Sequence, residues 1–479
     1  MSIDYSKVFA KTKILCTLGP ATSSKEMIKK LMEAGLDGVR LNFSHGDYNF
    51  YTNLFDEINA ACIEEDEPLA VLLDLQGPKI RIGNLKEPQF EILTGDTLEI
   101  SIEDFLGDNK HVTTSYKLLI EDANIGEQIL IDDGLIRLRI KEKTSNSVIC
   151  DIENGGILKP KKGMNLPGMK LSTPSVTDKD LRDLEFALNH RIDFIALSFV
   201  RQAEDIIQIK KWLKNKDFNI PVIAKIEKKE AIDNFDDILI ASDGIMVARG
   251  DLGVELEPED VPIVQKHIIK KCNEVGKLVI TATQMLESMI GNPIPTRAEA
   301  SDVANAVWDG TDVVMLSGET SVGKYPLRTV EIMNNIVLKA ELNVKQCVPI
   351  QFVIPKTVEE NLFDSMNKAI VEISKQVNAK AIVVFTHEGR TAQRISKYRP
   401  QARIIAISDH FETMNRLCLK WGVTSLFMED INKENVAIEK AKKMILAAKH
   451  VSSGDIVIFT AGAPYTEKSR VNWLRFESM

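Results

Sequence analysis

The stretch from Asp193 to Gly318 decides the fold. It holds five short apolar segments separated by longer amphipathic ones: DFIALSF (193–199), PVIAKIE (221–227), GIMVARG (244–250), KLVITAT (277–283) and DVVMLSG (312–318). Segments that are apolar on both faces are typical of parallel strands whose connections are helices that cover the sheet. We therefore predict five successive βα units in this stretch.

The first 77 residues show the same alternation of predicted strands and helices. Three further strands are predicted, at KTKILCTLG (11–19), GVRLNFS (38–44) and PLAVLLDLQG (68–77), with helical spacing between them. Three strands before residue 78 and five after residue 192 make eight βα units, which is the number in a closed parallel barrel. The chain is therefore predicted to be an α/β protein built on an eight-stranded βα barrel.

Two other regions depart from this alternation. From about residue 82 to 168, short alternating stretches and the turn pair Asp133-Gly134 predict a small all-β lid inserted into the barrel. After about residue 345, a helix near 359–376 and strands at KAIVVFT, RIIAISD and DIVIFTAG, with RVNWLRF closing the chain, predict an open α/β domain. The predicted domains are a barrel (1–77 and 175–345), an inserted lid (78–174) and a C-terminal domain (346–479).

Composition and charge restrict the class of protein. The 479 residues are 44% hydrophobic and 27% charged, with a net charge of −9. A mildly acidic chain lacks the broad basic field that nucleic acid or an anionic membrane favours, so neither partner is predicted. The chain has no apolar run of membrane-spanning length, no signal-peptide core and no CxxC pair among its six cysteines. These features predict a cytoplasmic protein with reduced thiols.

Polar residues follow nearly every predicted barrel strand, where barrel enzymes place their chemistry. Lys225 and Glu227 are two residues apart, so they point the same way from a strand, and Asp251 follows the next strand. Two carboxylates beside a lysine suit a Mg²⁺ ion that takes its other ligands from water and phosphate. The alternative is a structural ion pair at the barrel mouth.

Several other residues are candidates for binding an anion at the same mouth. Gly250 lies where a strand turns into a helix, and free backbone N–H groups there can hold phosphate or carboxylate; a simple turn glycine is the alternative. Arg40, Arg81 and Lys162 add positive charge, although a lysine run such as KPKK is usually solvated surface. His45 is ambiguous between packing and binding. The chain contains no GxxxxGK[ST] motif, so phosphoryl transfer would not use that cradle.

Long motifs in a fixed order resemble the pyruvate kinase family from about residue 11 to near the C-terminus. They are LNFSHG, LLDLQGPKIRIG, AKIEKKEAIDNFDDIL, MVARGDLGVE, ITATQMLESMI, PTRAEASDVANAVWDGTDVVMLSGET and FTHEGRTAQRISKYRP. The resemblance implies a barrel, an inserted lid and a C-terminal regulatory domain. It also implies a phosphotransferase that moves phosphoryl from phosphoenolpyruvate to ADP, giving pyruvate and ATP in the last step of glycolysis. A homotetramer is implied as well.

The resemblance implies roles for individual residues. Glu227 and Asp251 match ligands of Mg²⁺ or Mn²⁺, and Lys225 matches the cation that stabilises the transferring phosphoryl group. Thr283 lies where a proton relay to the enolate carbon is placed, with a bound water as the alternative donor. Substrate binding is implied for Arg40, Lys225, Gly250, Asp251 and Thr283, and nucleotide binding for Asn42, His45, Arg81 and Lys162.

One departure from the family pattern concerns a monovalent cation. The usual LDTKGPEIR reads LDLQGPKIR here, so the potassium positions of the family correspond to Asn42, Ser44, Asp74 and Leu75. Leu75 offers no oxygen, and Lys79 replaces a glutamate, so its ammonium could take the place of the ion. We predict that K⁺ is not required; the alternative is that Lys79 points to solvent and K⁺ still binds.

A second departure lies in the C-terminal domain. FTHEGRTA joins a strand to a helix, and Thr386, Gly389, Arg390 and Thr391 at this join form a candidate phosphate pocket. The family often has TxSGRTA here, whereas His387 and Glu388 replace part of that loop, and Glu388 would repel an anion. We predict allosteric regulation by a phosphorylated metabolite of unspecified identity; a structural helix cap is the alternative.

Two other functions compete with this one. A metal-dependent keto-acid lyase or aldolase on a similar barrel would also use paired carboxylates, but it needs neither a nucleotide site nor a lid carrying Lys162. A metabolite-sensing protein without turnover is the non-enzyme alternative. Effector identity, nucleotide preference and preferred divalent metal do not follow from the sequence.

Overall fold

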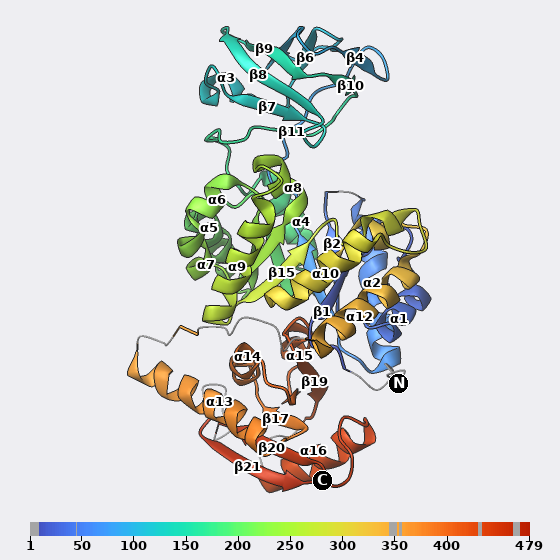
Figure 1. The fold of residues 1–479 in the computed structure, drawn as a ribbon, viewed down its shortest axis with the longest axis vertical. Helices are drawn as coiled ribbons and strands as arrows, with labels where there is room; N and C mark the ends of the chain where they lie inside the picture. Colours follow the sequence, from blue (N-terminus) through green and yellow to red (C-terminus); the bar gives the residue numbers. More distant parts are fainter. Residues whose placement is uncertain (1–8, 45, 344–351, 354–356, 430–433, 463–469) are drawn as a thin grey trace.

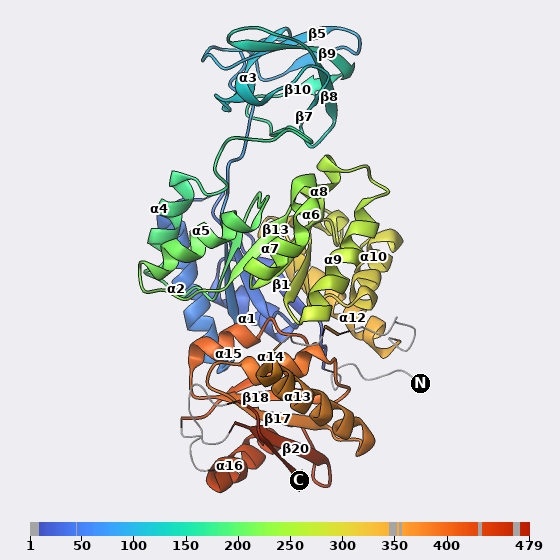
Figure 2. The same ribbon diagram turned by 90° about the vertical axis from the view of Figure 1, so that its left-hand side faces the viewer.

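The computed structural model has three parts along its long axis, with the barrel in the middle (Figure 1). It describes residues 9–44, 46–343, 352–353, 357–429, 434–462 and 470–479. A β-rich module lies beyond one end of the barrel, and an α/β domain packs against the other end (Figure 2). The predicted domain boundaries after residues 77 and 174 remain predictions, and the boundary after residue 345 lies outside the described residues.

Eight parallel strands close the barrel, as predicted, in the order β1-β16-β15-β14-β13-β12-β3-β2. Their bounds are β1 Lys13–Thr17, β2 Gly38–Asn42, β3 Ala70–Asp74, β12 Phe194–Leu197, β13 Val222–Ile226, β14 Gly244–Ala248, β15 Leu278–Ala282 and β16 Val313–Leu316. All but β2 are buried along their whole length, because helices cover the outside and side chains fill the inside.

Helices connect these strands and cover the barrel. They are α1 Lys25–Glu33, α2 Tyr48–Glu65, α4 Asp178–Ala187, α5 Ala203–Lys214, α6 Lys229–Asp233, α7 Phe235–Ala241, α8 Arg249–Glu255, α9 Val261–Val275, η2 Glu287–Ile290, α10 Arg297–Asp309, α11 Gly318–Ser321 and α12 Pro326–Leu342. Thr177 and Thr296 begin α4 and α10 with capping boxes, which satisfy backbone N–H groups of the first turn. Among the described residues, no helix combines the length and apolarity that crossing a membrane requires.

The inserted module has its own apolar core and two sheets, a six-stranded one (β11-β7-β8-β9-β5-β6) and a two-stranded one (β10-β4). Its elements are β4 Phe90–Ile92, β5 Thr97–Ser101, β6 His111–Thr113, α3 Leu119–Asp122, β7 Gln128–Ile131, β8 Ile136–Lys143, β9 Ser147–Asn154, β10 Gly156–Leu158 and β11 Met164–Asn165. Asp133 (φ +55°) and Gly134 (φ +87°) form the predicted turn between β7 and β8. The all-β prediction is correct apart from the short helix α3.

The C-terminal domain is an open sheet in the order β19-β18-β17-β20-β21, with β21 antiparallel to its neighbour. Its elements are α13 Val358–Gln376, β17 Ala381–Phe385, α14 Arg390–Lys397, β18 Arg403–Ser408, α15 Phe411–Leu417, β19 Val423–Phe427, α16 Glu434–Ala447, β20 Ile456–Ala461 and β21 Trp473–Ser478. Strands β19 and β21 were not predicted. Their sequences, VTSLF and WLRFES, are partly polar and only partly buried at the two sheet edges.

This domain closes the amino-terminal end of the barrel. Cys418 and Leu419, just after α15, belong to the same apolar cluster as Leu15, Ala70 and Leu278 inside the barrel. The carboxyl ends of the barrel strands are therefore left to face the inserted module (Figure 2). That end is where the candidate catalytic residues lie.

Candidate active site

The rows of residues that point into the barrel change from apolar to charged toward the carboxyl ends of the strands. On β3, Ala70 and Leu72 are apolar and Asp74 is not; on β13, Ile223 is followed two residues later by Lys225. Alternate residues of a strand share a face. The inward-facing side of each strand therefore supplies both the apolar core of the barrel and, at its carboxyl end, a residue of the charged site. The fold thus places the charges at one end of the packed core.

Lys225 is the centre of the charged group. Its ammonium lies 2.8 Å from Glu227 Oε1 and 3.3 Å from Asp74 Oδ1, and it donates to Ser198 Oγ at 2.7 Å. The two-residue spacing had predicted that Lys225 and Glu227 point the same way, and the structure confirms it. Burial lowers the pKa of Lys225, but the Asp74 and Glu227 carboxylates outweigh burial and raise it above the ordinary lysine value. This lysine is therefore charged.

Arg40, on strand β2, belongs to the same charged group. Its Nε donates to Asp74 Oδ2 at 2.6 Å and its Nη1 to Thr17 Oγ1 at 2.9 Å. Burial raises the pKa of Asp74, but Lys225 and Arg40 more than offset it, so the pKa falls below the ordinary value. Asp74 is thus an ionised carboxylate between two cations.

Glu227 differs from Asp74 although both are buried. Its Oε2 accepts a hydrogen bond from the Phe199 backbone N–H at 2.7 Å. Burial raises its pKa, Lys225 opposes that effect and Asp251 adds to it, so the pKa lies above the ordinary value. A cation placed between Glu227 and Asp251 would relieve this repulsion. The two carboxylates therefore fit a hard divalent ion, with oxygen lone pairs left to bind it.

Gly250 and Thr283 meet beside this group. The Gly250 backbone N–H donates to Thr283 Oγ1 at 2.7 Å, and the Thr283 hydroxyl donates to the Ala282 carbonyl at 2.6 Å. Thr283 has a φ of +70°, an uncommon conformation for a β-branched residue. Arg249 stabilises this turn by donating to the Thr283 carbonyl and pairing with Asp302.

The predicted nucleotide-binding residues are divided between the barrel and the lid. Asn42 lies at the end of β2, where its Oδ1 accepts the Ser44 N–H at 3.2 Å, and His45 lies outside the described residues. In the lid, Arg81 donates to the Lys161 carbonyl at 2.8 Å, and Lys162 pairs with Asp132 at 2.8 Å. A cleft between lid and barrel is lined by lid residues such as Asp133 and Gly163 and by Asp251, Lys228 and Arg201 of the barrel, and none of the predicted nucleotide-binding residues that the structure describes lines it.

Some residues of this group were not assigned roles from the sequence. Thr17 and the Phe199 N–H hold Arg40 and Glu227, and Ser198 binds Lys225. Lys228 and Arg201 bring charge to the cleft. The only signal for these residues was their position at strand ends, which Thr17 and Ser198 share with many structural residues.

The fold and this arrangement define an enzyme of the βα-barrel class whose mouth holds fixed cations and a pair of carboxylates next to a lid. Residues 9–330 match the family model described as pyruvate kinase, barrel domain, and residues 364–476 match pyruvate kinase, alpha/beta domain. The chain belongs to the pyruvate kinase family.

Individual pyruvate kinases are similar to nearly the whole chain. A pyruvate kinase of Staphylococcus saprophyticus is 45% identical over 97% of this chain and 80% of its own length. One of Staphylococcus aureus strain MRSA252 is 44% identical with the same coverage. The crystal structure of a pyruvate kinase from Cryptosporidium parvum superposes with a TM-score of 0.92 and 36% identity, covering 100% of this chain and 97% of that one.

These findings make the chain a phosphotransferase of glycolysis whose substrates are phosphoenolpyruvate and ADP. The keto-acid lyase considered from the sequence is not supported, since both domains match one family and the lid is present. The non-catalytic sensor is set aside for the same reason.

Proposed function

We propose that the reaction is carried by the continuous group Arg40, Asp74, Lys225 and Glu227 at the barrel mouth, together with Asp251 and Thr283. The supporting observation is the buried Lys225 ammonium held by Asp74, Glu227 and Ser198. The phosphoryl group leaves the enol oxygen of phosphoenolpyruvate and joins the terminal phosphate oxygen of ADP. A positioned cation stabilises the negative charge on the phosphoryl group during transfer.

Each residue has a proposed part in this step. Arg40 and Lys225 bind the substrate phosphate and neutralise it, and the Gly250–Asp251 turn binds the substrate carboxylate end. Glu227 and Asp251 would hold Mg²⁺ or Mn²⁺, which supplies Lewis acidity to the phosphate oxygens when bound. Thr283 Oγ relays the proton that enolpyruvate gains on carbon. A bound water remains the alternative donor.

The lid residues are proposed to act when the cleft closes. Arg81 and Lys162 of the lid, together with Asn42 and His45, would bind ADP. Support comes from the cleft between lid and barrel, which Gly163, the neighbour of Lys162 in sequence, lines together with Asp251 of the barrel. Closure would exclude water from the transferring group.

A coupled assay tests the function. With phosphoenolpyruvate, ADP and Mg²⁺, we expect pyruvate formation that depends on ADP, measured through lactate dehydrogenase. Pyruvate released from phosphoenolpyruvate without ADP, or no turnover by a folded protein, would contradict the proposal.

The chain is also proposed to work without potassium. Leu75 is buried and brings no oxygen to the cation position, and Asp74 is already neutralised by Arg40 and Lys225. Lys79, four residues after Leu75, is exposed and lines the same cleft as Asp251. Its ammonium is proposed to replace the monovalent ion.

We expect activity in tetramethylammonium buffer to change less than about twofold on adding KCl, well under the tenfold that 1.4 kcal/mol would produce. Lys79→Glu should lower potassium-free activity by at least about fivefold, since an ion-pair contact of ~4 Å is worth ~1–4 kcal/mol. Lys141→Glu, the same charge reversal on lid strand β8, is the control and should change little. Strong activation of the wild type by KCl would refute the idea.

A phosphorylated effector is proposed to bind at the start of α14. Thr386 and Thr391 are nearly buried there, and the Gly389 N–H (φ +77°) donates to Thr386 Oγ1 at 3.0 Å. Arg390, however, is paired with Glu388 at 2.6 Å, so an anion must displace that carboxylate.

The effector proposal is tested with a panel of sugar phosphates and nucleoside monophosphates. At least one should shift the phosphoenolpyruvate concentration at half saturation by about fivefold or more, a typical allosteric coupling. Glu388→Ser should lower the effector concentration required. If no compound shifts the curve, the loop is a structural helix cap.

A homotetramer and a cytoplasmic location are proposed on the family resemblance. The second agrees with the free thiols of Cys16, Cys62, Cys150, Cys272 and Cys418.

A further inference from the structure

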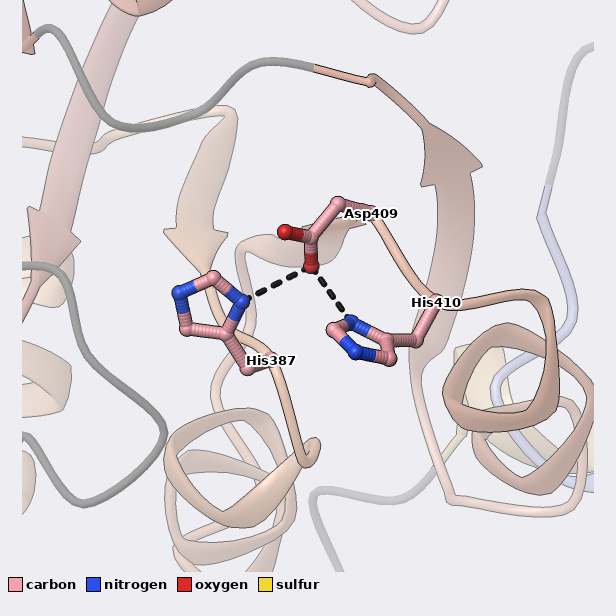
Figure 3. A group of neighbouring side chains, drawn as sticks. All are labelled: His387, Asp409 and His410. Atoms are coloured by element: carbon pink, nitrogen blue, oxygen red, sulfur yellow. Dashed lines mark hydrogen bonds and ion pairs between the residues drawn. The ribbon is translucent and has the colours of Figure 1, made fainter.

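A cluster of two histidines and one aspartate lies in the C-terminal domain, at the carboxyl ends of β17 and β18 (Figure 3). Asp409 Oδ1 lies 2.8 Å from His387 Nδ1 and 2.6 Å from His410 Nδ1. One oxygen therefore joins both imidazole rings, and the three atoms lie within 4.8 Å of one another. None of the functions proposed above uses this cluster.

The backbone around the cluster is held by hydrogen bonds. The Thr413 hydroxyl of α15 donates to the His387 carbonyl at 2.6 Å, and the His410 N–H donates to Ser408 Oγ at 3.2 Å. Adjacent parallel strands carry the two loops, so the sheet sets the spacing of the rings. Ligand atoms on such a frame lose little conformational entropy on binding.

The donor set is that of a transition-metal site. Burial raises the pKa of Asp409, but His410 and His387 more than offset it, so this carboxylate is ionised. Nε2 of His387 is buried and has no hydrogen-bond partner within the described residues, so Nδ1 makes the polar contact of that ring. Two imidazole nitrogens and a carboxylate oxygen suit Zn²⁺ and its neighbours, whereas Mg²⁺ prefers oxygen ligands.

An ion can reach the cluster from a cavity of about 740 Å³ between the C-terminal domain and the barrel. His387 and His410 line it on one side, and His190 and Arg191 of the barrel line it on the other. The His410 side chain is 50% exposed, so an ion can approach its ring from the cavity. The cavity has room for a water as a fourth ligand.

We propose that His387, Asp409 and His410 form a binding site for one Zn²⁺-type ion, completed by water and separate from the divalent site at the barrel mouth. The site would also strengthen the junction between domains. The loop that carries Asp409 and His410 leads into α15, and Cys418 and Leu419 after that helix pack into the barrel interior. Metal binding should therefore raise the melting temperature.

Zn²⁺ binding to the full-length protein, measured by competition with a chromophoric chelator in saturating Mg²⁺, tests this proposal. The excess Mg²⁺ keeps the barrel-mouth site occupied. We expect one Zn²⁺ per chain, and binding at least about 100-fold weaker in His387→Gln and His410→Gln, because losing a direct ligand costs more than the 10- to 100-fold of an outer-shell change. Co²⁺ should give a visible absorption band in the wild type that His410→Gln lacks.

His111→Gln is the matched control. His111 is a half-exposed lid histidine that also faces two carboxylates, at 3.5 and 3.6 Å. This variant should bind Zn²⁺ as the wild type does, and Zn²⁺ should raise its melting temperature equally. His410 is half-exposed, so its variant should fold, which circular dichroism verifies. Equal Zn²⁺ affinity in wild type and His410→Gln, or no Zn²⁺ bound by either, would overturn the proposal.

Discussion

Lys225→Met should lower kcat by about 10³-fold, while the protein remains folded. The ammonium lies within 3.3 Å of Asp74 and 2.8 Å of Glu227, and it is the buried cation at the proposed position of the phosphoryl group. Removing one preorganised group that stabilises a transition-state charge costs about 10²–10³ in kcat. We expect the upper value, because a whole charge is lost and methionine leaves Glu227 without its cation. The coupled assay measures kcat and KM.

Lys13→Met separates this effect from the general cost of losing a buried lysine. Lys13 is 3% exposed and pairs with Asp37 at 2.9 Å, but it begins strand β1 at the opposite end of the barrel. Breaking a buried ion pair on one side destabilises by ~3–5 kcal/mol, so both variants should melt at lower temperature. Only Lys225→Met should lose kcat. A kcat within tenfold of the wild type in that variant would exclude the proposed role.

Glu227→Gln should raise the Mg²⁺ concentration needed for half-maximal activity by at least about 10- to 100-fold, the cost of disturbing a metal site. The amide is nearly the same shape but has one oxygen, no charge and an NH₂ group that would face the Lys225 ammonium or the Phe199 N–H. Titration of activity with Mg²⁺ and with Mn²⁺ measures the shift. Asp251→Asn should act in the same direction.

Glu319→Gln is the control for this prediction. Glu319 is also fully buried and also accepts backbone N–H groups, from Leu286 at 3.1 Å and Ser317 at 2.7 Å. Its variant should lose stability without changing the Mg²⁺ requirement. An equal shift in both variants would show that the effect is structural.

The same carboxylate predicts the direction of the pH dependence. Because burial and Asp251 hold the pKa of Glu227 above its ordinary value, protonation begins at a less acidic pH than in an exposed glutamate. Protonation removes the charge that would bind the metal. The Mg²⁺ requirement should therefore rise as the pH falls toward that pKa, and the rise should be absent in Glu227→Gln.

The pattern of apolar segments was sufficient to predict the barrel, the inserted module and the C-terminal sheet. A strand buried on both faces is mostly apolar, and β3, β13 and β14 are apolar up to the residue that enters the site. Strand β19 escaped detection because a sheet edge tolerates polar residues such as Thr424 and Ser425.

The sequence by itself determined that Lys225 and Glu227 share a face, because side chains alternate along a strand whatever surrounds them. Only the tertiary structure decided that Asp74 lies between Arg40 and Lys225. It also decided that His387 and His410 both contact Oδ1 of Asp409. Except for Asp409 and His410, which are neighbours in sequence, these contacts join residues far apart in the chain, and their geometry depends on which strands are neighbours and in which register. Local spacing carries no information on either, since strand order is set by the packing of the whole barrel and sheet.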